Sequence, residues 1–431
     1  MGRGSVACGI GACTAIAALM SFGTTADGDS GSWTTLRASP LARTEVTSAA
    51  IGRSIYVLGG YGTAGAPSTA VTRYDVDRNR WNLAAPLPRP LNHAMAVPWR
   101  GDLYVVGGYT GLPLSLGIGT GGVADATRDF WRYEPERDRW SRMPPAPTAR
   151  AAAAAGVLDG KLYVAAGADA LAARRRLEVF DFASRRWSRG PDVPLATEHT
   201  AGAVVGGAFY VVGGRPHYGG KNHRFVQRYQ PRERRWQRVA DLRRGRGGFA
   251  AAAVCGRVAV FGGEDPRSGL PGTIPEVELY DPGDDRWMPL PAMGTPRHGL
   301  GGASVGRRIY ALEGGDVTLL SVTNVGEALT VPCPNGAAED EQRPASAGRP
   351  VERGGPDDPG DTSRPASRPS SSARSEAAAE EAGAEAAPTG SDGSLPATGF
   401  AVALLCGIGA ALTAGGLLLR RRTRYDQSTG A

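Results

Sequence analysis

Arginine side chains recur at matching places along this sequence and are its clearest candidates for ligand chemistry. When the repeating segments of the chain are aligned, one position is arginine in four segments out of six: Arg43, Arg150, Arg246 and Arg297. Arginine binds oxyanions in a bidentate manner. Four guanidinium groups that converge on one opening would bind a carboxylate, a sulfate or an acidic sugar. The alternative is that these side chains only brace adjacent loops.

Three histidines lie close to the same position. His93 and His199 share one aligned position two residues further on, and His298 lies one residue from it. Three imidazoles around one axis would form a metal cage, but a hydrogen-bonding role at the mouth is the simpler interpretation. We therefore predict seven ligand-binding residues, the four arginines and these histidines, and no metal or cofactor.

Glu198 is the single candidate for a general acid or base, with His199 beside it. No Ser/His/Asp signature, phosphate-binding loop or Cys-x-x-Cys pair is present in the sequence. These observations favour a protein without enzymatic activity and leave catalysis open as the alternative.

The segments that carry these residues repeat across residues 33–332. Each contains an apolar run that ends in a glycine pair, such as Gly107-Gly108, then an aromatic-acid pair and a tryptophan, such as Tyr74-Asp75 and Trp81. The aromatic residue precedes its tryptophan by 7 residues in all five complete segments. Each tryptophan precedes the next glycine-type pair by 26 residues, or by 27 for Gly314-Gly315. Only the connection between the pair and the aromatic residue varies, which is typical of a loop between packed strands.

A period near 50 residues with this signature resembles the kelch repeat. The resemblance implies an all-β fold, a six-bladed β-propeller whose blades are four-stranded antiparallel sheets around a central channel. Six glycine-type pairs are followed by only five tryptophans, and Trp33 near the N-terminus is the sixth. We therefore expect Trp33–Leu36 to form the outer strand of the last blade and close the ring.

The C-terminal region resembles the cell-wall sorting signal of Gram-positive surface proteins. Residues 395–399 read Leu395, Pro396, Ala397, Thr398 and Gly399; the uncharged segment 400–419 and the basic tail 420–431 follow. The uncharged segment is long enough to span a membrane, with the tail in the cytoplasm. The resemblance implies that a sortase cleaves after Thr398 and joins the protein to peptidoglycan. An ordinary transmembrane anchor is the alternative.

Two further segments complete the predicted organisation. Residues 1–26 have the composition of a secretory signal peptide. Residues 333–394 are rich in Pro, Ser, Ala and Glu and predict a disordered spacer that spans the cell wall. Cys255 and Cys333 lie outside the terminal segments, where an oxidising compartment would permit a disulfide. Because Cys255 ends an inner strand and Cys333 follows a strand of the next blade, the sequence favours two free thiols.

The sequence therefore predicts a secreted propeller, anchored to the cell wall or the membrane, that binds carbohydrate or protein ligands. The net charge of +7 comes with 49 basic residues, but no nucleic-acid motif is present, so no nucleic acid partner is predicted. Galactose oxidase and the sialic-acid mutarotases have similar propellers, which makes an extracellular sugar-modifying enzyme the alternative function. The copper site of galactose oxidase needs a cysteine crosslinked to tyrosine, and neither Cys255 nor Cys333 is placed for that.

Overall fold

The computed structural model describes residues 1–2, 31–111, 126–169, 172–217 and 220–333. The predicted signal peptide, spacer, sorting motif, membrane span and cytoplasmic tail lie outside the described residues, apart from residues 1–2 and 333. Within the described part of the chain, no helix is long and apolar enough to cross a membrane.

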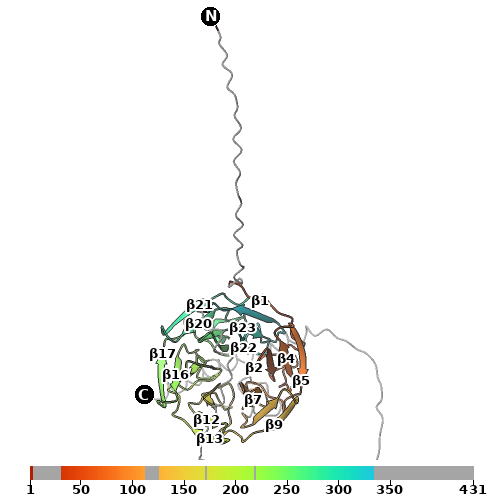
Figure 1. Ribbon diagram of the computed structural model, residues 1–431, viewed down its shortest axis with the longest axis vertical. Coiled ribbons are helices and arrows are strands. Elements are labelled where there is room, and N and C mark those ends of the chain that lie inside the picture. The colour runs from red at the N-terminus through yellow and green to blue at the C-terminus, as the bar shows by residue number, and fades with distance from the viewer. Residues whose placement is uncertain (3–30, 112–125, 170–171, 218–219, 334–431) are drawn as a thin grey trace, which may run out of the picture. The chain divides into compact units, whose positions relative to one another are not determined.

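Residues 31–333 form six four-stranded antiparallel sheets, the blades of a propeller (Figure 1). Blade 1 contains β2 (Thr47–Ile51), β3 (Ser54–Leu58), β4 (Val71–Asp75) and β5 (Arg80–Ala84), and blade 2 contains β6 (Met95–Trp99), β7 (Asp102–Val106), β8 (Phe130–Glu134) and β9 (Arg139–Arg142). Blade 3 contains β10 (Ala154–Leu158), β11 (Lys161–Ala165), β12 (Leu177–Asp181) and β13 (Arg186–Arg189). Blade 4 contains β14 (Ala201–Val205), β15 (Ala208–Val212), β16 (Val226–Gln230) and β17 (Arg235–Val239).

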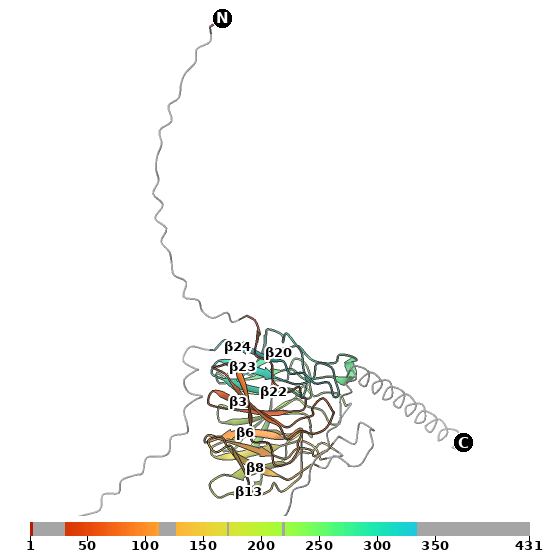
Figure 2. The same cartoon turned by 90° about the vertical axis from the view of Figure 1, so that its right-hand side faces the viewer.

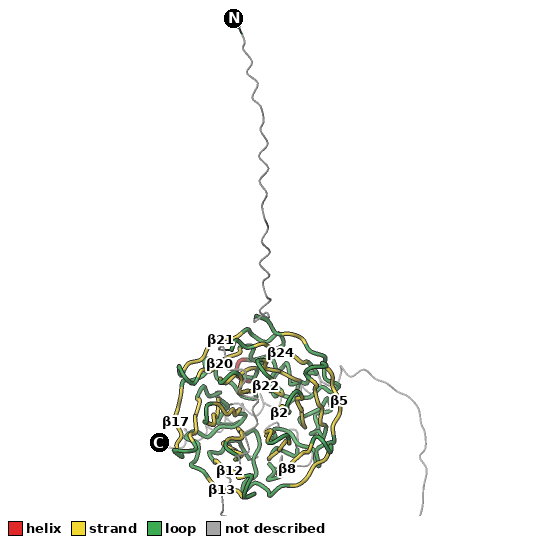
Figure 3. Tube along the Cα trace, viewed as in Figure 1, coloured by secondary structure: helices red, strands yellow, loops and turns green. Residues whose placement is uncertain are grey.

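Blade 5 contains β18 (Ala250–Val254), β19 (Arg257–Phe261), β20 (Val277–Asp281) and β21 (Arg286–Leu290), and a short 3₁₀ helix, η2 (Pro266–Ser268), lies between its second and third strands. Blade 6 contains β22 (Gly301–Val305), β23 (Arg308–Leu312), β24 (Gly326–Thr330) and the N-terminal β1 (Thr34–Thr35). The first strand of each blade lies innermost and the fourth lies at the rim, as β2 and β5 do in Figure 1. The described regular structure is almost entirely strand, as Figure 3 shows.

The N-terminal strand closes the ring, as the sequence predicts. Thr34 and Thr35 of β1 pair antiparallel with Ala328 and Glu327 of β24. The apolar core lies between the faces of neighbouring sheets; for example, Val57 of blade 1 packs in one cluster with Tyr310 of blade 6. Every blade interface, including the one that joins the two ends of the domain, is therefore filled in the same way.

Six tryptophans confirm this closure by a repeated hydrogen bond. Each indole Nε1–H donates to the backbone carbonyl four residues after the preceding tryptophan in the ring, at 2.8–2.9 Å. The pairs are Trp33 with Pro291, Trp81 with Arg37, Trp140 with Ala85, Trp187 with Pro144, Trp236 with Pro191, and Trp287 with Ala240. Trp33 thus contacts blade 5 as the other five contact the blades before them.

The glycine pairs are required where one blade meets the next. Gly59 and Gly60 have φ values of 64° and 83°, and a Cβ atom on Gly59 would lie 2.3 Å from the carbonyl oxygen of Leu91 in blade 2. The N–H of Gly60 donates to that carbonyl at 2.8 Å. In blade 6 the equivalent hydrogen bond runs from the N–H of Gly314 to the carbonyl of Arg43. The sixth pair is therefore Glu313-Gly314, one residue earlier than predicted, and the step of 26 residues is uniform.

A ring of backbone hydrogen bonds surrounds the channel axis. Six equivalent residues, which we call the axial ring, all have left-handed backbone conformation: Glu45, His93, Ala152, His199, Gly248 and Gly299. The carbonyl of each accepts a hydrogen bond from the next blade, at 2.7–3.5 Å, and the last of these bonds returns from Gly299 to Val46 of blade 1. The first and last blades are thus linked in a closed cycle.

The connections form two faces. The loop face comprises the blade-to-blade connections (36–46, 85–94, 143–153, 190–200, 240–249 and 291–300) and the described residues of the connections between second and third strands (59–70, 107–111, 126–129, 166–169, 172–176, 213–217, 220–225, 262–276 and 313–325). The turn face comprises the remaining turns (52–53, 76–79, 100–101, 135–138, 159–160, 182–185, 206–207, 231–234, 255–256, 282–285 and 306–307). The side view in Figure 2 shows these connections at the two edges of the sheets.

The two ends of the propeller, residues 31 and 333, lie on the turn face, and a disulfide is found there. Val331 donates its N–H to the carbonyl of Arg307, in the turn that joins β22 to β23. Cys333 is bridged to Cys255, in the turn that joins β18 to β19, with a Cα–Cα distance of 5.5 Å. The expectation of two free thiols is wrong, because the turn of blade 5 reaches the end of β24. A loop of 78 residues contributes roughly 4 kcal/mol in the chain-entropy model.

Replacing Trp33 with alanine should destabilise the whole domain. We expect a loss of about 3 kcal/mol in the free energy of unfolding, because the change empties a blade interface and removes the bond to Pro291. Chemical denaturation of Trp33→Ala beside Trp236→Ala, its equivalent inside the chain, measures this. Similar losses are expected for the two variants; an unchanged midpoint for Trp33→Ala alone would contradict closure by the N-terminal strand.

Candidate functional site

The four aligned arginines lie inside the blades. Arg43, Arg150, Arg246 and Arg297 are each at most 1% exposed. Each forms an ion pair with a buried glutamate: Arg43 with Glu313 at 2.8 Å, Arg150 with Glu178 at 2.7 Å, Arg246 with Glu278 at 2.6 Å, and Arg297 with Glu327 at 3.1 Å. Burial lowers the pKa of Arg297 to about 10, so its guanidinium remains charged at neutral pH.

These pairs brace the ends of the strands. The guanidinium of Arg246 also donates to the carbonyls of Gly262 and Glu276, where the second strand of blade 5 ends and the third begins. Carboxylates at the same place hold the incoming connection: Glu278 accepts from the N–H of Arg243, and Glu327 from that of Thr295. Each arginine therefore ties three segments of its blade together.

The six repeats serve as an internal comparison of this position. In blades 3, 5 and 6, arginine faces a glutamate at the second residue of the third strand. In blade 4 the two positions are Thr197 and Gln227, and in blade 2 they are Leu91 and Trp131. In blade 1 the strand position is Thr72, and Arg43 pairs with Glu313 instead. Glu313 occupies the place of the first glycine in the sixth pair and has the left-handed φ of 56° that a glycine would have there. Arginine occurs only where a carboxylate is supplied.

The prediction that these arginines bind a ligand at the mouth is therefore wrong. Each guanidinium pairs with a glutamate and donates to at least one backbone carbonyl, and the side chains lie out of reach of solvent. The alternative interpretation, a brace for adjacent loops, describes them. The physical reason is that an arginine near a strand end gains more partners inside the blade than at the axis.

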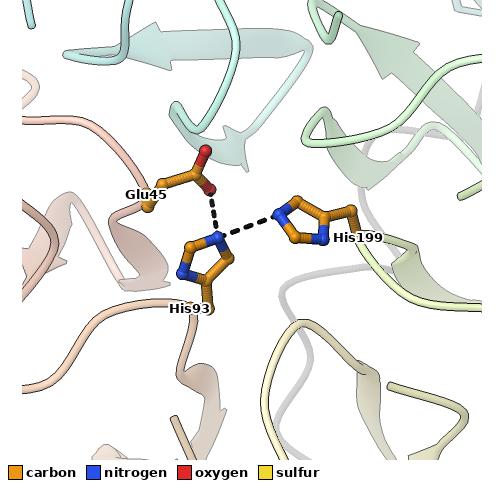
Figure 4. A group of neighbouring side chains, drawn as sticks. All are labelled: Glu45, His93 and His199. Carbon is orange, nitrogen blue, oxygen red and sulfur yellow. Dashed lines mark hydrogen bonds and ion pairs between the residues drawn. The ribbon is translucent and has the colours of Figure 1, made fainter. Parts of the chain in front are cut away.

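Two of the three predicted histidines meet at the axis, with a residue that the prediction omitted. His93 and His199, both members of the axial ring, have their Nε2 atoms 2.9 Å apart. The Nε2 atom of His93 also lies 3.0 Å from Oε2 of Glu45 (Figure 4). The three side chains come from three different blade-to-blade connections, and each residue has the left-handed backbone conformation of the axial ring.

The charge state of Glu45 follows from this arrangement. Burial opposes its ionisation, but the charge and hydrogen bond of His93 outweigh burial and hold the pKa of Glu45 well below its usual range. Burial, together with the positive charge of Arg215, lowers the pKa of His199. The axis therefore carries an ionised carboxylate beside imidazoles.

His298 does not join the group at the axis. It is fully buried, and its Nδ1 and Nε2 atoms lie 3.0 and 2.8 Å from the carbonyls of Gly315 and Leu319. Burial opposes its protonation, but the carboxylates of Glu264 and Glu45 raise the pKa of His298. The predicted trio of histidines is corrected: the described group whose ligating atoms lie within 4.8 Å of one another is Glu45, His93 and His199.

Glu198 is held in a buried chain of charges. It contacts His199 through Nδ1 and pairs with Arg215 at 2.9 Å, and Arg215 pairs with Glu264 at 2.8 Å. Although burial acts in the opposite direction, His199 and Arg215 lower the pKa of Glu198 to about 2. A carboxylate that binds its proton so weakly is a poor general acid or base at neutral pH. The geometry gives it the role of orienting His199.

The axial group lies on the wall of the central channel. A cavity of 170 Å³ there is bordered by Glu45, His93 and His199 and otherwise mostly by small side chains of the innermost strands, such as Ala155 and Ala251. Small residues are required because six strands converge here. The cavity gives solvent-sized species a route to the three polar side chains.

Glu45 was within reach of sequence reasoning. It lies two residues after Arg43, as His199 lies two residues after Thr197, so the alignment that finds the histidines also places Glu45 beside them. Arg215 and Glu264 also occupy a shared position, the residue after the second member of a glycine-type pair. Listing every aligned position by chemistry, rather than by one residue type, would have found all three.

Comparisons with known proteins agree with this architecture. The family profile described as the KLHDC2/KLHL20/DRC7 Kelch-repeats domain matches residues 18–192, and the profile described as the Kelch motif matches residues 245–294. The chain contains kelch repeats. With the six sheets described above, the prediction of a six-bladed kelch propeller is confirmed.

Individual relatives share these repeats at moderate identity. Kelch-like protein terF of Aspergillus terreus is 27% identical over 325 residues, which cover 71% of this chain and 69% of that protein. Kelch-like protein 34 of Homo sapiens is 37% identical over 136 residues, 31% of this chain and 20% of that protein. This chain therefore spans only about a fifth of the human relative. The solved structure of YjhT covers 69% of this chain and 97% of its own, with a TM-score of 0.57 and 19% identity, which shows a shared fold.

Replacing Arg246 with threonine should be severely destabilising, and a second change should relieve it. The single variant leaves Glu278 buried without its partner, which costs about 3–5 kcal/mol. The double variant Arg246→Thr/Glu278→Gln copies the Thr197 and Gln227 pair of blade 4, so we expect it to regain at least half of that loss. Urea denaturation of wild type and both variants measures the coupling; equal losses in both variants would contradict the brace.

Proposed function

We propose that the propeller is a binding module whose loop face docks an acidic surface of a partner protein. The kelch-like relatives support a binding module in general terms, and the distribution of charge supports the choice of face. Ten basic side chains of the loop face are exposed: Arg37, Arg89, Arg128, Arg174, Arg175, Arg176, Lys221, Arg224, Arg243 and Arg267. Among the described residues of this face, only Glu276 and Asp316 are exposed acids.

The turn face is balanced in charge, which makes the difference between the faces meaningful. Its described exposed basic residues are Arg53, Arg78, Arg100, Arg137, Arg185, Arg232, Arg234 and Arg307, and its exposed acids are Asp77, Glu136, Asp138, Asp159, Glu233, Asp284 and Asp285. A face with a large excess of one sign of charge attracts an oppositely charged partner and speeds its association. The excess of exposed basic side chains on the loop face supports the proposal most directly. The acidic ligand expected from the sequence would bind these exposed side chains and not the four buried arginines.

The position of the chain ends suits such a module. Residues 31 and 333, the two ends of the propeller, lie on the turn face, and Cys333 is fixed there by its bridge to Cys255. Because Cys333 lies on the turn face, a wall-anchored propeller tethered through its C-terminal end would present its loop face to the medium. A disulfide is also the expected state of paired cysteines outside the cytoplasm. We include secretion and anchoring through Thr398 in the proposal on these grounds and on the sequence pattern.

Charge reversal on the loop face should weaken binding of an acidic probe. Arg176, Arg243 and Arg267 are exposed, so their triple change to glutamate leaves the buried braces intact. We expect at least a tenfold loss in affinity for poly-glutamate at low salt, a loss that shrinks as salt screens the charges. Calorimetric titration of the purified domain provides the measurement.

The matched control reverses three exposed arginines of the turn face, Arg232, Arg234 and Arg307. This control should retain wild-type affinity. Equal losses in the two triple variants, or no binding by the wild type, would reject the loop face as the docking surface. Tighter binding of a sulfated polysaccharide than of poly-glutamate, with the same dependence on Arg176 and Arg243, would replace the protein partner with a carbohydrate.

Anchoring has its own test in the cells that make the protein. Covalent attachment to peptidoglycan predicts that muramidase releases the propeller and that detergent does not. Changing Thr398 to alanine should leave the protein in the detergent-soluble membrane fraction. If detergent alone extracts the wild type, a plain transmembrane anchor replaces the sortase-linked form, and the binding proposal is unaffected.

A further inference from the structure

Three side chains at the channel axis direct their ligating atoms at one small volume. The Nε2 atom of His93 lies 2.9 Å from Nε2 of His199 and 3.0 Å from Oε2 of Glu45. All three atoms lie within 4.8 Å of one another (Figure 4). When the proton of each imidazole is on Nδ1, three lone pairs face one another, and a positive charge between them offsets their repulsion. One shared proton satisfies a single pair of these atoms, whereas a divalent cation satisfies all three.

The axial ring makes room for this convergence. Its three other members, Ala152, Gly248 and Gly299, carry a methyl group or no side chain. A Cβ atom on Gly299 would lie 2.7 Å from the carboxyl carbon of Glu45 and 2.5 Å from its backbone nitrogen. Three members of the ring therefore place side chains at the axis, and the other three leave the space for them.

The second nitrogen of each imidazole is fixed from behind. Nδ1 of His93 lies 2.6 Å from Oδ1 of Asn92, and Nδ1 of His199 contacts the carboxylate of Glu198. Glu198 is itself held by Arg215. An acceptor at Nδ1 keeps the proton on that atom and leaves the lone pair of Nε2 for a ligand, which is how metal-binding histidines are oriented.

We propose that Glu45, His93 and His199 bind a divalent transition metal ion, with Zn²⁺ as the best match, at the axis of the propeller. Two imidazoles and one carboxylate are a donor set that zinc uses, while calcium and magnesium prefer oxygen alone. Tetrahedral zinc with bonds of about 2.1 Å separates its ligating atoms by roughly 3.4 Å. The two observed separations, 2.9 and 3.0 Å, reach that value by small rotations of the side chains.

The site is accessible, and it leaves one coordination position for a small molecule. All three residues border the channel cavity of 170 Å³, which provides an entry path for the ion. A fourth, exchangeable ligand is typical of zinc bound by three protein groups. This site lies below the loop face and does not depend on the binding function proposed for that face.

The experiment uses the full chain without a histidine tag, stripped of metal by a chelator and titrated with Zn²⁺ against a chromophoric competitor. We expect one zinc ion per chain. His199→Gln and Glu45→Gln should each lower the affinity at least tenfold, since each removes a ligand or its charge. The matched control is His223→Gln, because His223 is half-buried in the 213–225 connection and stacks on Phe225 rather than facing the axis.

A loss in the two axial variants with retention in His223→Gln supports the site. No zinc on the wild type, or equal zinc on all four proteins, overturns it. Should the axial variants fail to fold, the visible spectrum of the Co²⁺-loaded wild type decides. An intense spectrum of four-coordinate cobalt with nitrogen and oxygen ligands supports the site, and a weak six-coordinate spectrum or none overturns it.

Discussion

The closed cycle of hydrogen bonds around the channel is the constraint on which the rest of the structure depends. Each blade contributes one left-handed residue whose carbonyl accepts an N–H from the next blade, and the cycle returns from Gly299 to Val46. Left-handed backbone is unfavourable for side chains such as those of Glu45 and His93. It persists because every blade makes the same bond, so no blade can relax without breaking two interfaces.

Burial of charge follows from the same crowding. Backbone carbonyls lie close together where the second strand of a blade ends and the third begins. In blade 5 the single side chain of Arg246 donates to two of them, those of Gly262 and Glu276. Its charge then requires a carboxylate, because an unpaired buried ion costs several kcal/mol. In blade 4, the uncharged side chains of Thr197 and Gln227 make hydrogen bonds to the backbone at this place. In blade 1, Arg43 pairs with Glu313 of the neighbouring blade 6. In all four blades that have the arginine a buried carboxylate accompanies it, which indicates a structural pair.

The sequence predicted the fold well because strand lengths and tryptophan spacing are set by packing and recur without change. It placed Trp33 in the last blade for the same reason. The predictions from the sequence failed where a residue's role depends on a partner that is distant in the chain. Arg43 pairs with Glu313, and Cys255 forms a disulfide with Cys333. At the axis it found His93 and His199 by alignment but passed over Glu45, since a search for one residue type misses a mixed ligand set.

The axial ring also explains how one scaffold can hold both a rigid frame and a chemical site. The ring uses only the backbone of its six members, so its side chains can change as long as the axis is not overfilled. Glu45, His93 and His199 are ring members whose side chains are free to serve chemistry at the axis. The side chains of the four buried arginines hold the blades together, so replacing an arginine requires a change of its glutamate as well. Chemistry at the axis and charge on the loops are thus the two properties of this propeller that can evolve without altering how its blades are held together.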